Sequence, residues 1–408
     1  MTNKGGMCYD KRKKKREYKM LDFIYNTPTK VYFGKGRHKE IGKILADYGY
    51  QKIMMQYGKG SVKASGLYEE ILCSLQEYKI QVIECGGVEP NPKVEFVRHA
   101  VRIAKEEKVE MILAVGGGSV LDSSKITAIG AMTDADAWDI QKGEALPKSA
   151  LPVGCILTIA AAGSEMSNSA VLSSEAEGEK RGINTELNRL QFAVMNPELT
   201  FSVSKYQTAC GIVDMMTHTL ERYFMDVPPT PLTDRISEAI LKSIVEAGQV
   251  VMQNPCDYDA RATLMWASSL SHNGLTGCGR INALPVHKLE HAVSGLYDKV
   301  AHGAGLAVLY PAWARYVYKY APSRFGNLAR AVWGVVEEDD EKASLLGIER
   351  MEQFFSQIEM PKRLAEFGIQ RGDLEKLALL CTANGRVTVP SYLPLGLKEI
   401  KEIFESCY

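Results

Sequence analysis

Short apolar runs alternate with amphipathic stretches over the first half of the chain. Between the runs, apolar positions recur three and four residues apart, which predicts helices over 38–47, 67–78, 93–107 and 120–131. The runs themselves are typical of buried strands, at 31–33, 52–57, 81–83, 111–115 and 153–158, with one more at 191–194. Strands that alternate with helices favour parallel βαβ units, with helices covering both faces of one sheet.

The pattern changes after Pro197, where few strand signals remain. Long stretches with a period near 3.6 predict helices over 204–224, 233–252, 260–271 and 285–295, and further helices beginning at Ala304, Arg324, Ala343, Leu374 and Leu397. We therefore predict a tail at 1–19, an α/β domain at 20–200 and an all-helical domain at 201–408.

Bulk composition narrows the function classes. The 408 residues suffice for two domains, and 49 basic residues balance 49 acidic ones, which argues against a main role on nucleic acid or on a membrane surface. The nine cysteines show no Cys-x-x-Cys spacing, which favours reduced thiols in a cytoplasmic protein. The basic run at 11–16 stands alone, so we interpret it as a disordered, solvated tail rather than as a nucleic-acid tag.

Two glycine-rich turns follow predicted strands. The first, Gly116-Gly117-Gly118-Ser119, leads into a helix and suits a pyrophosphate, although a tight turn that merely needs glycine is the alternative. The second, Gly58-Lys59-Gly60-Ser61, contains no acidic residue that would favour a free 2′-hydroxyl. Because Lys59, Ser61 and Lys63 stand there instead, we expect NADP(H) rather than NAD(H).

Histidines at helical spacing suggest a metal site. Asp214 and His218 are four residues apart, and so are His287 and His291, so each pair shares one helix face. Helical histidines are more often surface or core residues, but a carboxylate with several imidazoles suits Fe(II) or Zn(II), between which the residue types do not decide. We expect His272 to be a bystander, and His38 and His99 to be surface residues.

Together these motifs resemble the iron-containing alcohol dehydrogenase family, most closely its butanol dehydrogenase-like branch. The resemblance runs from Met20 to the C-terminus and rests on 116–125, 158–166, 211–218 and 287–305. It implies the dehydroquinate synthase-like fold, in which a nucleotide-binding α/β domain and a helical domain enclose the active site, and it implies a homodimer.

The resemblance also implies roles for individual residues. The metal ligands would be Asp214, His218, His287 and His302, and His291 would lie near the nicotinamide and relay a proton. The cofactor would contact Gly58, Gly60, Ser61, Asn91, Gly117, Gly118, Ser119, Asp122, Thr158, Ser164 and Lys180.

Two departures from the family pattern bear on this site. The segment 296–302 is one residue longer than expected, which could swing His302 away unless the loop absorbs the extra residue. Ala162 stands where the family usually has a second threonine, so one hydroxyl contact to the cofactor is lost.

The resulting prediction is a metal-dependent enzyme that transfers hydride between NAD(P)H and short to medium primary alcohols and aldehydes, such as butanol and butanal. Alternatives are a glycerol dehydrogenase-like polyol oxidoreductase or a dehydroquinate synthase on the same architecture, and a nucleotide- and metal-binding protein without turnover. One aspartate with three histidines, and the motif at 158–166, argue against the synthase.

Overall fold

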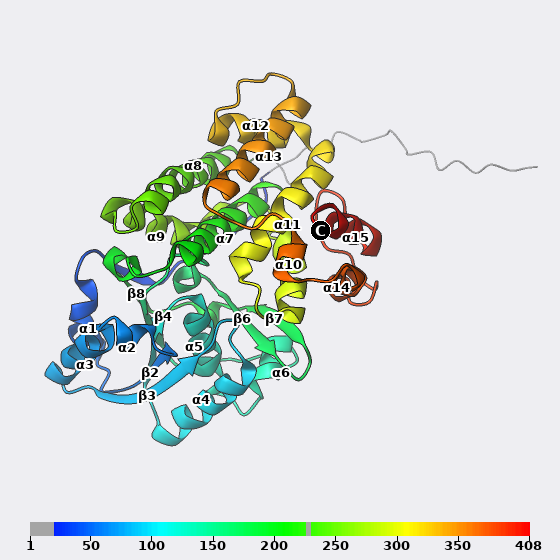
Figure 1. Ribbon diagram of the computed structural model, residues 1–408. Helices are drawn as coiled ribbons and strands as arrows, with labels where there is room; N and C mark the ends of the chain where they lie inside the picture. Colours follow the sequence, from blue (N-terminus) through cyan, green and yellow to red (C-terminus); the bar gives the residue numbers. More distant parts are fainter. Residues whose placement is uncertain (1–19, 226–229) are drawn as a thin grey trace, which may run out of the picture.

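A computed structural model describes residues 20–225 and 230–408 (Figure 1). Its first part holds a six-stranded parallel sheet with the strand order β1-β8-β5-β4-β2-β3. All of the strands that the apolar runs predicted are present, as β1 (Lys30–Phe33), β2 (Lys52–Gly58), β3 (Gln81–Val88), β4 (Met111–Gly116), β5 (Val153–Leu157) and β8 (Phe192–Met195).

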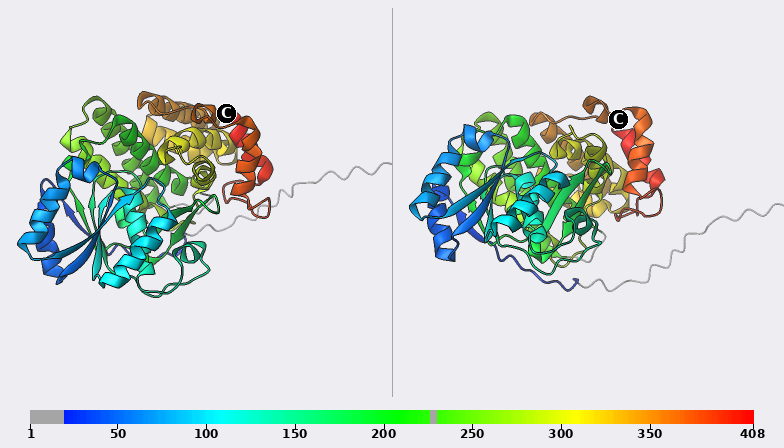
Figure 2. Two further views of the ribbon diagram at one scale, coloured as in Figure 1. Left: turned by 60° about the horizontal axis from the view of Figure 1, so that its bottom comes forward. Right: turned by 90° about the horizontal axis from the view of Figure 1, so that it is seen from below.

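Helices cover both faces of this sheet, which fans out between them in Figure 2. On one face, α1 (Ile41–Tyr48) and α3 (Leu67–Glu77) pack on side chains such as Ile53 and Met55. On the other, α4 (Val94–Glu107) and α5 (Gly118–Gly130) pack on side chains such as Met54. Neighbouring residues of a strand point to opposite faces, so an all-apolar strand fills two cores at once.

The strand order places both glycine-rich turns at one edge of the sheet. From β2 the chain runs outward to β3, whereas from β4 it runs the other way to β5 and β8. The crevice between β2 and β4, at their carboxyl ends, is therefore the topological switch point, where open α/β sheets bind ligands.

An antiparallel hairpin, β6 (Ser169–Ser174) and β7 (Glu179–Asn184), was missed by the sequence prediction. Its second strand reads Glu-Lys-Arg-Gly-Ile-Asn and is not buried, so no apolar alternation marks it. The amide of Gln141, on α6 (Ala137–Lys142), donates to the carbonyls of Ala170 and Arg181 and so holds both strands. The hairpin extends from the sheet toward the helical part (Figure 1).

The second part of the chain is helical, as predicted. Its central helix is α7 (Lys205–Tyr223), which is buried along most of its length, and Ser204 caps its first turn by accepting from the Gln207 amide. Around it lie α8 (Pro231–Gln253), α9 (Tyr258–His272), α10 (Pro285–Leu296), α11 (His302–Val317), α12 (Pro322–Trp333), α13 (Asp340–Gln357), α14 (Leu374–Cys381) and α15 (Leu397–Ser406).

Several predictions concern the ends and boundaries of these parts. The tail at 1–19, with its basic run, lies outside the described residues. The last sheet strand ends at Met195 and α7 begins at Lys205, with a short 3-10 turn, η4 (Pro197–Thr200), between them, and the division near residue 200 stays a prediction. None of the helices in the described part of the chain combines the length and apolarity that crossing a membrane requires.

Candidate active site

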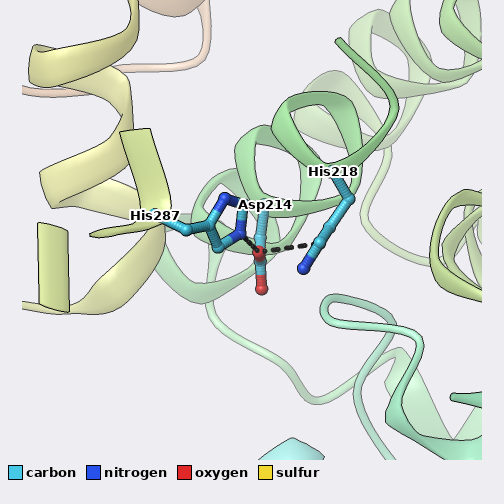
Figure 3. A group of neighbouring side chains, drawn as sticks. All are labelled: Asp214, His218 and His287. Atoms are coloured by element: carbon cyan, nitrogen blue, oxygen red, sulfur yellow. Dashed lines mark ion pairs between the residues drawn. The ribbon is translucent and has the colours of Figure 1, made fainter. Parts of the chain in front are cut away.

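Three imidazoles from three helices converge on one carboxylate oxygen. Asp214 and His218 lie one turn apart on α7, and His287 reaches them from α10 (Figure 3). From Asp214 Oδ1 the distances are 3.2 Å to His218 Nδ1, 3.5 Å to His287 Nε2 and 3.8 Å to His302 Nε2, at the start of α11.

The donor set fits a divalent metal. Asp214 Oδ1, His218 Nδ1 and His287 Nε2 are buried without a hydrogen-bond partner among the described residues, although buried polar atoms are normally paired. Ligands at the usual bond lengths around a tetrahedral ion lie about 3.4 Å from one another. The measured separations from Asp214 are close to that value, so one ion could satisfy the unpaired atoms together.

Two further carboxylates hold the histidines from behind, and sequence reasoning missed both. Glu221 bonds to His287 Nδ1, and Glu290 bonds to His302 Nδ1. Glu221 also accepts the amide of Val286, at 2.5 Å, where α10 begins. Because each carboxylate accepts a hydrogen bond from Nδ1, Nε2 is the ring atom that faces Asp214 and could bind a metal, as in carboxylate–histidine–metal arrangements. The sequence did contain a signal for both glutamates, because each follows a predicted metal ligand by three residues and so shares its helix face.

Electrostatics in the site follow from burial and from these charges. Burial raises the pKa of the Asp214 carboxyl, but the facing imidazoles outweigh it and hold that pKa well below its usual range. Burial and the charge on His287 lower the pKa of His218 to about 3. Burial also disfavours the charged form of His287, but Glu221 and Asp214 raise its pKa to about 9. The Asp214 carboxylate is therefore ionised beside an uncharged His218, and a bound divalent cation would take the place of the proton on His287.

One close helix contact brings His302 to this group. A Cβ on Gly303 would lie 2.1 Å from the carbonyl oxygen of Cys210, so only glycine lets α11 approach α7 so closely. The loop before His302 contacts the α/β part, where Asn91 donates to the Asp298 carbonyl (3.2 Å) and Lys93 to its carboxylate (2.9 Å). The extra residue that we expected in 296–302 therefore does not swing His302 away from the group.

The predicted cofactor residues gather at the carboxyl edge of the sheet. Gly58, Gly60 and Ser61 follow β2, Asn91 follows β3, and Thr158 follows β5. The start of α5 holds the remaining glycines and a serine, which are Gly117, Gly118 and Ser119. The first amides of this helix point toward the crevice.

Asp122 and Ser164, which the resemblance places on the cofactor, bond to each other. Ser164 Oγ donates to Asp122 Oδ1 (2.6 Å), and Asp122 Oδ2 accepts the Val171 amide (3.0 Å) of the hairpin. The buried ammonium of Lys125 donates to Ser164 as well. These side chains therefore fasten the loop before β6 onto α5.

Lys180, on β7, spans the two parts of the chain. Its ammonium donates to Asn91 Oδ1 and to Ser294 Oγ of α10, each at 3.0 Å, and lies 3.9 Å from the Glu290 carboxylate. The β6–β7 hairpin, which the sequence prediction missed, therefore positions the Lys180 ammonium in the site.

The loop after β5 is tied directly to the helical part. Ser268 Oγ accepts the Gly163 amide and donates to the Ala161 carbonyl, both at 3.1 Å. Gly163 has φ +63°, and a Cβ there would lie 2.3 Å from the Ser268 carbonyl oxygen, so this turn requires glycine. These contacts hold the predicted cofactor loop against α9.

Three predictions about the other histidines have different outcomes. His272 belongs to none of the groups of side chains that could hold a metal in the described residues, so the bystander prediction is not contradicted, although its ring centroid lies 4.0 Å from that of His218 and Arg222 Nη2 contacts its Nδ1 at 2.7 Å. His38 is buried between Glu70 and Asn196 rather than on the surface, since η1 (Arg37–Glu40) turns it inward. His99 is exposed, as predicted. His291 lies near the metal group, with its ring centroid 5.6 Å from that of His302.

Comparison with known proteins tests the resemblance. A model described as iron-containing alcohol dehydrogenase matches residues 28–197, and the C-terminal model of the same family matches residues 208–408. The chain belongs to the iron-containing alcohol dehydrogenase family. It is thus an oxidoreductase acting on CH–OH groups, and the family implies a nicotinamide cofactor and a metal.

Relatives and solved structures cover nearly the whole chain. NADH-dependent butanol dehydrogenase A of Clostridium acetobutylicum is 39% identical, over 95% of this chain and all of that protein. The NADPH-dependent aldehyde reductase YqhD of Escherichia coli is 32% identical, with the same coverage. The crystal structure of NADH-dependent butanol dehydrogenase A from Thermotoga maritima superposes with a TM-score of 0.91 at 35% identity, covering 96% of this chain and 99% of that one. The family fold predicted from the motifs is confirmed.

Proposed function

We propose that this alcohol dehydrogenase reduces short to medium aldehydes such as butanal to primary alcohols, and runs the reverse reaction. The observation that carries the proposal is the group of one carboxylate and three imidazoles, which lies beside a sheet edge suited to a dinucleotide. The printed activities of the Clostridium and Escherichia relatives, a butanol dehydrogenase and an aldehyde reductase, support this substrate class.

Asp214, His218, His287 and His302 would hold the metal, for which Fe(II) and Zn(II) are both suitable. When bound, the ion supplies Lewis acidity at the substrate oxygen, and the nicotinamide supplies or accepts the hydride. Glu221 and Glu290 keep the Nε2 atoms of two of these histidines turned toward Asp214.

His291 would move the proton. Burial, Lys180 and the neighbouring imidazoles lower its pKa well below the usual range, so the ring is neutral near neutral pH. A neutral imidazole can accept a proton from one side and release one from the other. We therefore assign His291 as the residue that exchanges a proton between substrate and solvent.

The cofactor would lie across the switch point of the sheet. Its pyrophosphate would meet the first amides of α5, at Gly117, Gly118 and Ser119, with Asp122 and Ser164 holding that turn in shape. Asn91, Lys180 and Thr158 would contact the nicotinamide half.

For the adenosine ribose we propose Gly58, Gly60 and Ser61, with NADP(H) favoured because Lys59 and Lys63 are close by. One observation weakens the preference: Lys59 pairs with Glu89 at 2.5 Å, so the end of β3 brings an acid to the turn. We also propose a homodimer, on the resemblance, and a cytoplasmic location, to which the free thiols of all eight described cysteines are suited.

The test is butanal-dependent oxidation of NADPH and of NADH by protein stripped of metal and then reloaded anaerobically with Fe(II) or with Zn(II). We expect turnover to return with metal and to be faster with NADPH. Bound metal and bound nucleotide without turnover of any aldehyde or alcohol would overturn the proposal.

A further inference from the structure

His272 lies between the proposed metal site and the loop that follows β5, yet the mechanism above gives it no role. It is the last residue of α9, and its ring centroid is 4.0 Å from that of His218. On its other side, a Cβ on Gly163 would come within 3.0 Å of His272 Cβ. His272 thus lies beside both a proposed metal ligand and the predicted cofactor loop.

Arg222 fixes the tautomer of this imidazole. Its guanidinium donates to His272 Nδ1 at 2.7 Å and is itself held by the carbonyls of His218 (2.7 Å) and Ser271 (3.0 Å). A guanidinium can only donate hydrogen bonds, so Nδ1 must be the acceptor. The ring is therefore neutral, and its single proton is on Nε2.

The Nε2–H group is an available donor. Nε2 has no hydrogen-bond acceptor among the described residues. It is also absent from the set of buried side-chain atoms in that part of the chain that lack a hydrogen-bond partner, so it keeps access to solvent. His272 also stands outside the groups of side chains whose spacing could hold a metal in residues 20–225 and 230–408. A proton on Nε2 removes the lone pair that coordination would need.

We propose that His272 is a specificity-determining residue that donates a hydrogen bond from Nε2 to a second oxygen of the substrate. The inference rests on the proposed function and refines its substrate class: aldehydes that carry a further hydroxyl or carbonyl oxygen are preferred over unsubstituted aldehydes of equal length. A single neutral hydrogen bond of this kind is worth about tenfold in kcat/KM.

The kinetic test compares propanal, 2-hydroxypropanal and 3-hydroxypropanal with the wild type, His272→Leu and His272→Gln. We expect the wild type to favour at least one hydroxyaldehyde over propanal by about tenfold, the leucine variant to lose that ratio, and the glutamine variant, which keeps an N–H donor, to retain part of it. The matched control is His99→Leu on exposed α4 surface, which should keep the wild-type ratio. Equal ratios in the wild type and His272→Leu would overturn the inference.

A binding measurement gives a readout that does not depend on turnover. Protein with ¹⁵N-labelled histidine, loaded with Zn(II) and saturated with oxidised cofactor, is titrated with 1-propanol, 1,2-propanediol and 1,3-propanediol, and the His272 signal is assigned by its loss in His272→Gln. We expect the proton on Nε2, and a shift with a diol but not with 1-propanol. A proton on Nδ1, or equal shifts with all three alcohols, would contradict the inference.

The two failures can be told apart. If no aldehyde is turned over, the proposed function fails, while the diol titration still decides the role of His272. If aldehydes are turned over but neither the ratio nor the His272 signal depends on the second oxygen, only the inference about His272 fails.

Discussion

At the residue scale, the metal-binding group depends on side chains that do not themselves face the metal position. Glu221 is fully buried and binds both His287 Nδ1 and the first amides of α10, so one carboxylate sets the ring orientation and the start of the helix. Glu290 binds His302 Nδ1 and fits against Gly305, where a Cβ would lie 2.9 Å from its Cγ. Such supporting groups tune metal sites as strongly as many ligands do.

Glu221→Gln is expected to weaken metal binding by about tenfold to a hundredfold, because a neutral amide holds the Nδ1 proton of His287 less firmly. Competition with a chelator measures the metal Kd of the variant. Glu246→Gln, on the exposed side of α8, is the control and should match the wild type. An unchanged Kd in Glu221→Gln would show that ring orientation does not need this charge.

Two exposed residues at the end of β2 and β3 are expected to set the cofactor preference. Lys59→Ala should lower the ratio of kcat/KM for NADPH to that for NADH by about tenfold, because the ammonium would face the 2′-phosphate. Glu89→Gln should raise the same ratio by about threefold, because the acid pairs with Lys59 and its removal frees that charge. Steady-state kinetics with both cofactors measure the ratio.

The control for this pair is Lys43→Ala, an exposed lysine of α1, which should leave the ratio unchanged. If Lys59→Ala leaves the ratio unchanged as well, the turn at 58–61 does not face the 2′-position.

At the element scale, the site depends on how closely α11 approaches α7. Glycine at 303 lets the first turn of α11 rest on the backbone at Cys210, one turn before Asp214. That contact, rather than the length of the preceding loop, brings His302 to within 3.8 Å of the Asp214 carboxylate.

Gly303→Ala is expected to lower the free energy of unfolding by about 2 kcal/mol and to weaken metal binding by at least tenfold, since the helices must separate to admit the methyl group. The gain in helix propensity from alanine, about 1 kcal/mol at most, is the smaller effect. Urea unfolding and metal titration measure the two quantities. Gly372→Ala, where a Cβ meets nothing within 4 Å in the described part of the chain, is the control, and equal stability of the two variants would contradict the close-contact argument.

At the scale of the whole molecule, a buried acid links the sheet part to the helical part. Glu165, in η2 (Ser164–Met166), is 1% exposed and accepts a hydrogen bond from Ser269 of α9. Burial raises the pKa of this carboxyl above its usual range. In the unfolded chain such an acid ionises at its ordinary pKa, but in the fold it ionises only at a higher pH. As the pH rises between these two values the free energy of unfolding falls, because only the folded state must bury the charge.

Glu165→Gln removes that charge while an amide oxygen can still accept from Ser269. We therefore compare the free energy of unfolding of Glu165→Gln with that of the wild type at two pH values. The variant should gain about 1 kcal/mol over the wild type when the pH is raised from about 5 to about 8. Urea midpoints at both pH values measure it, with Glu338→Gln, on the exposed surface, as the control. A relative stability that falls with rising pH would mean that the ionised carboxylate is stabilised in the fold.

The sequence by itself determined what depends on short-range periodicity. Apolar runs marked every strand of the main sheet, and i, i+4 spacing put Asp214 and His218 on one helix face. The glycine runs after β2 and β4 marked the turns at the switch point, and the order of the motifs identified the family. These features are local, so one segment contains all the information that specifies each of them.

Only the tertiary structure decided the contacts between distant segments. The polar strand β7 has no periodic signal, yet its pairing with β6 brings Lys180 to Asn91 and Ser294. Glu221 meets His287 across 66 residues, and Arg222 meets His272 across 50. No spacing rule reaches so far, because such contacts are set by how whole helices pack, and helix packing depends on the complete buried surface rather than on the residues that finally touch.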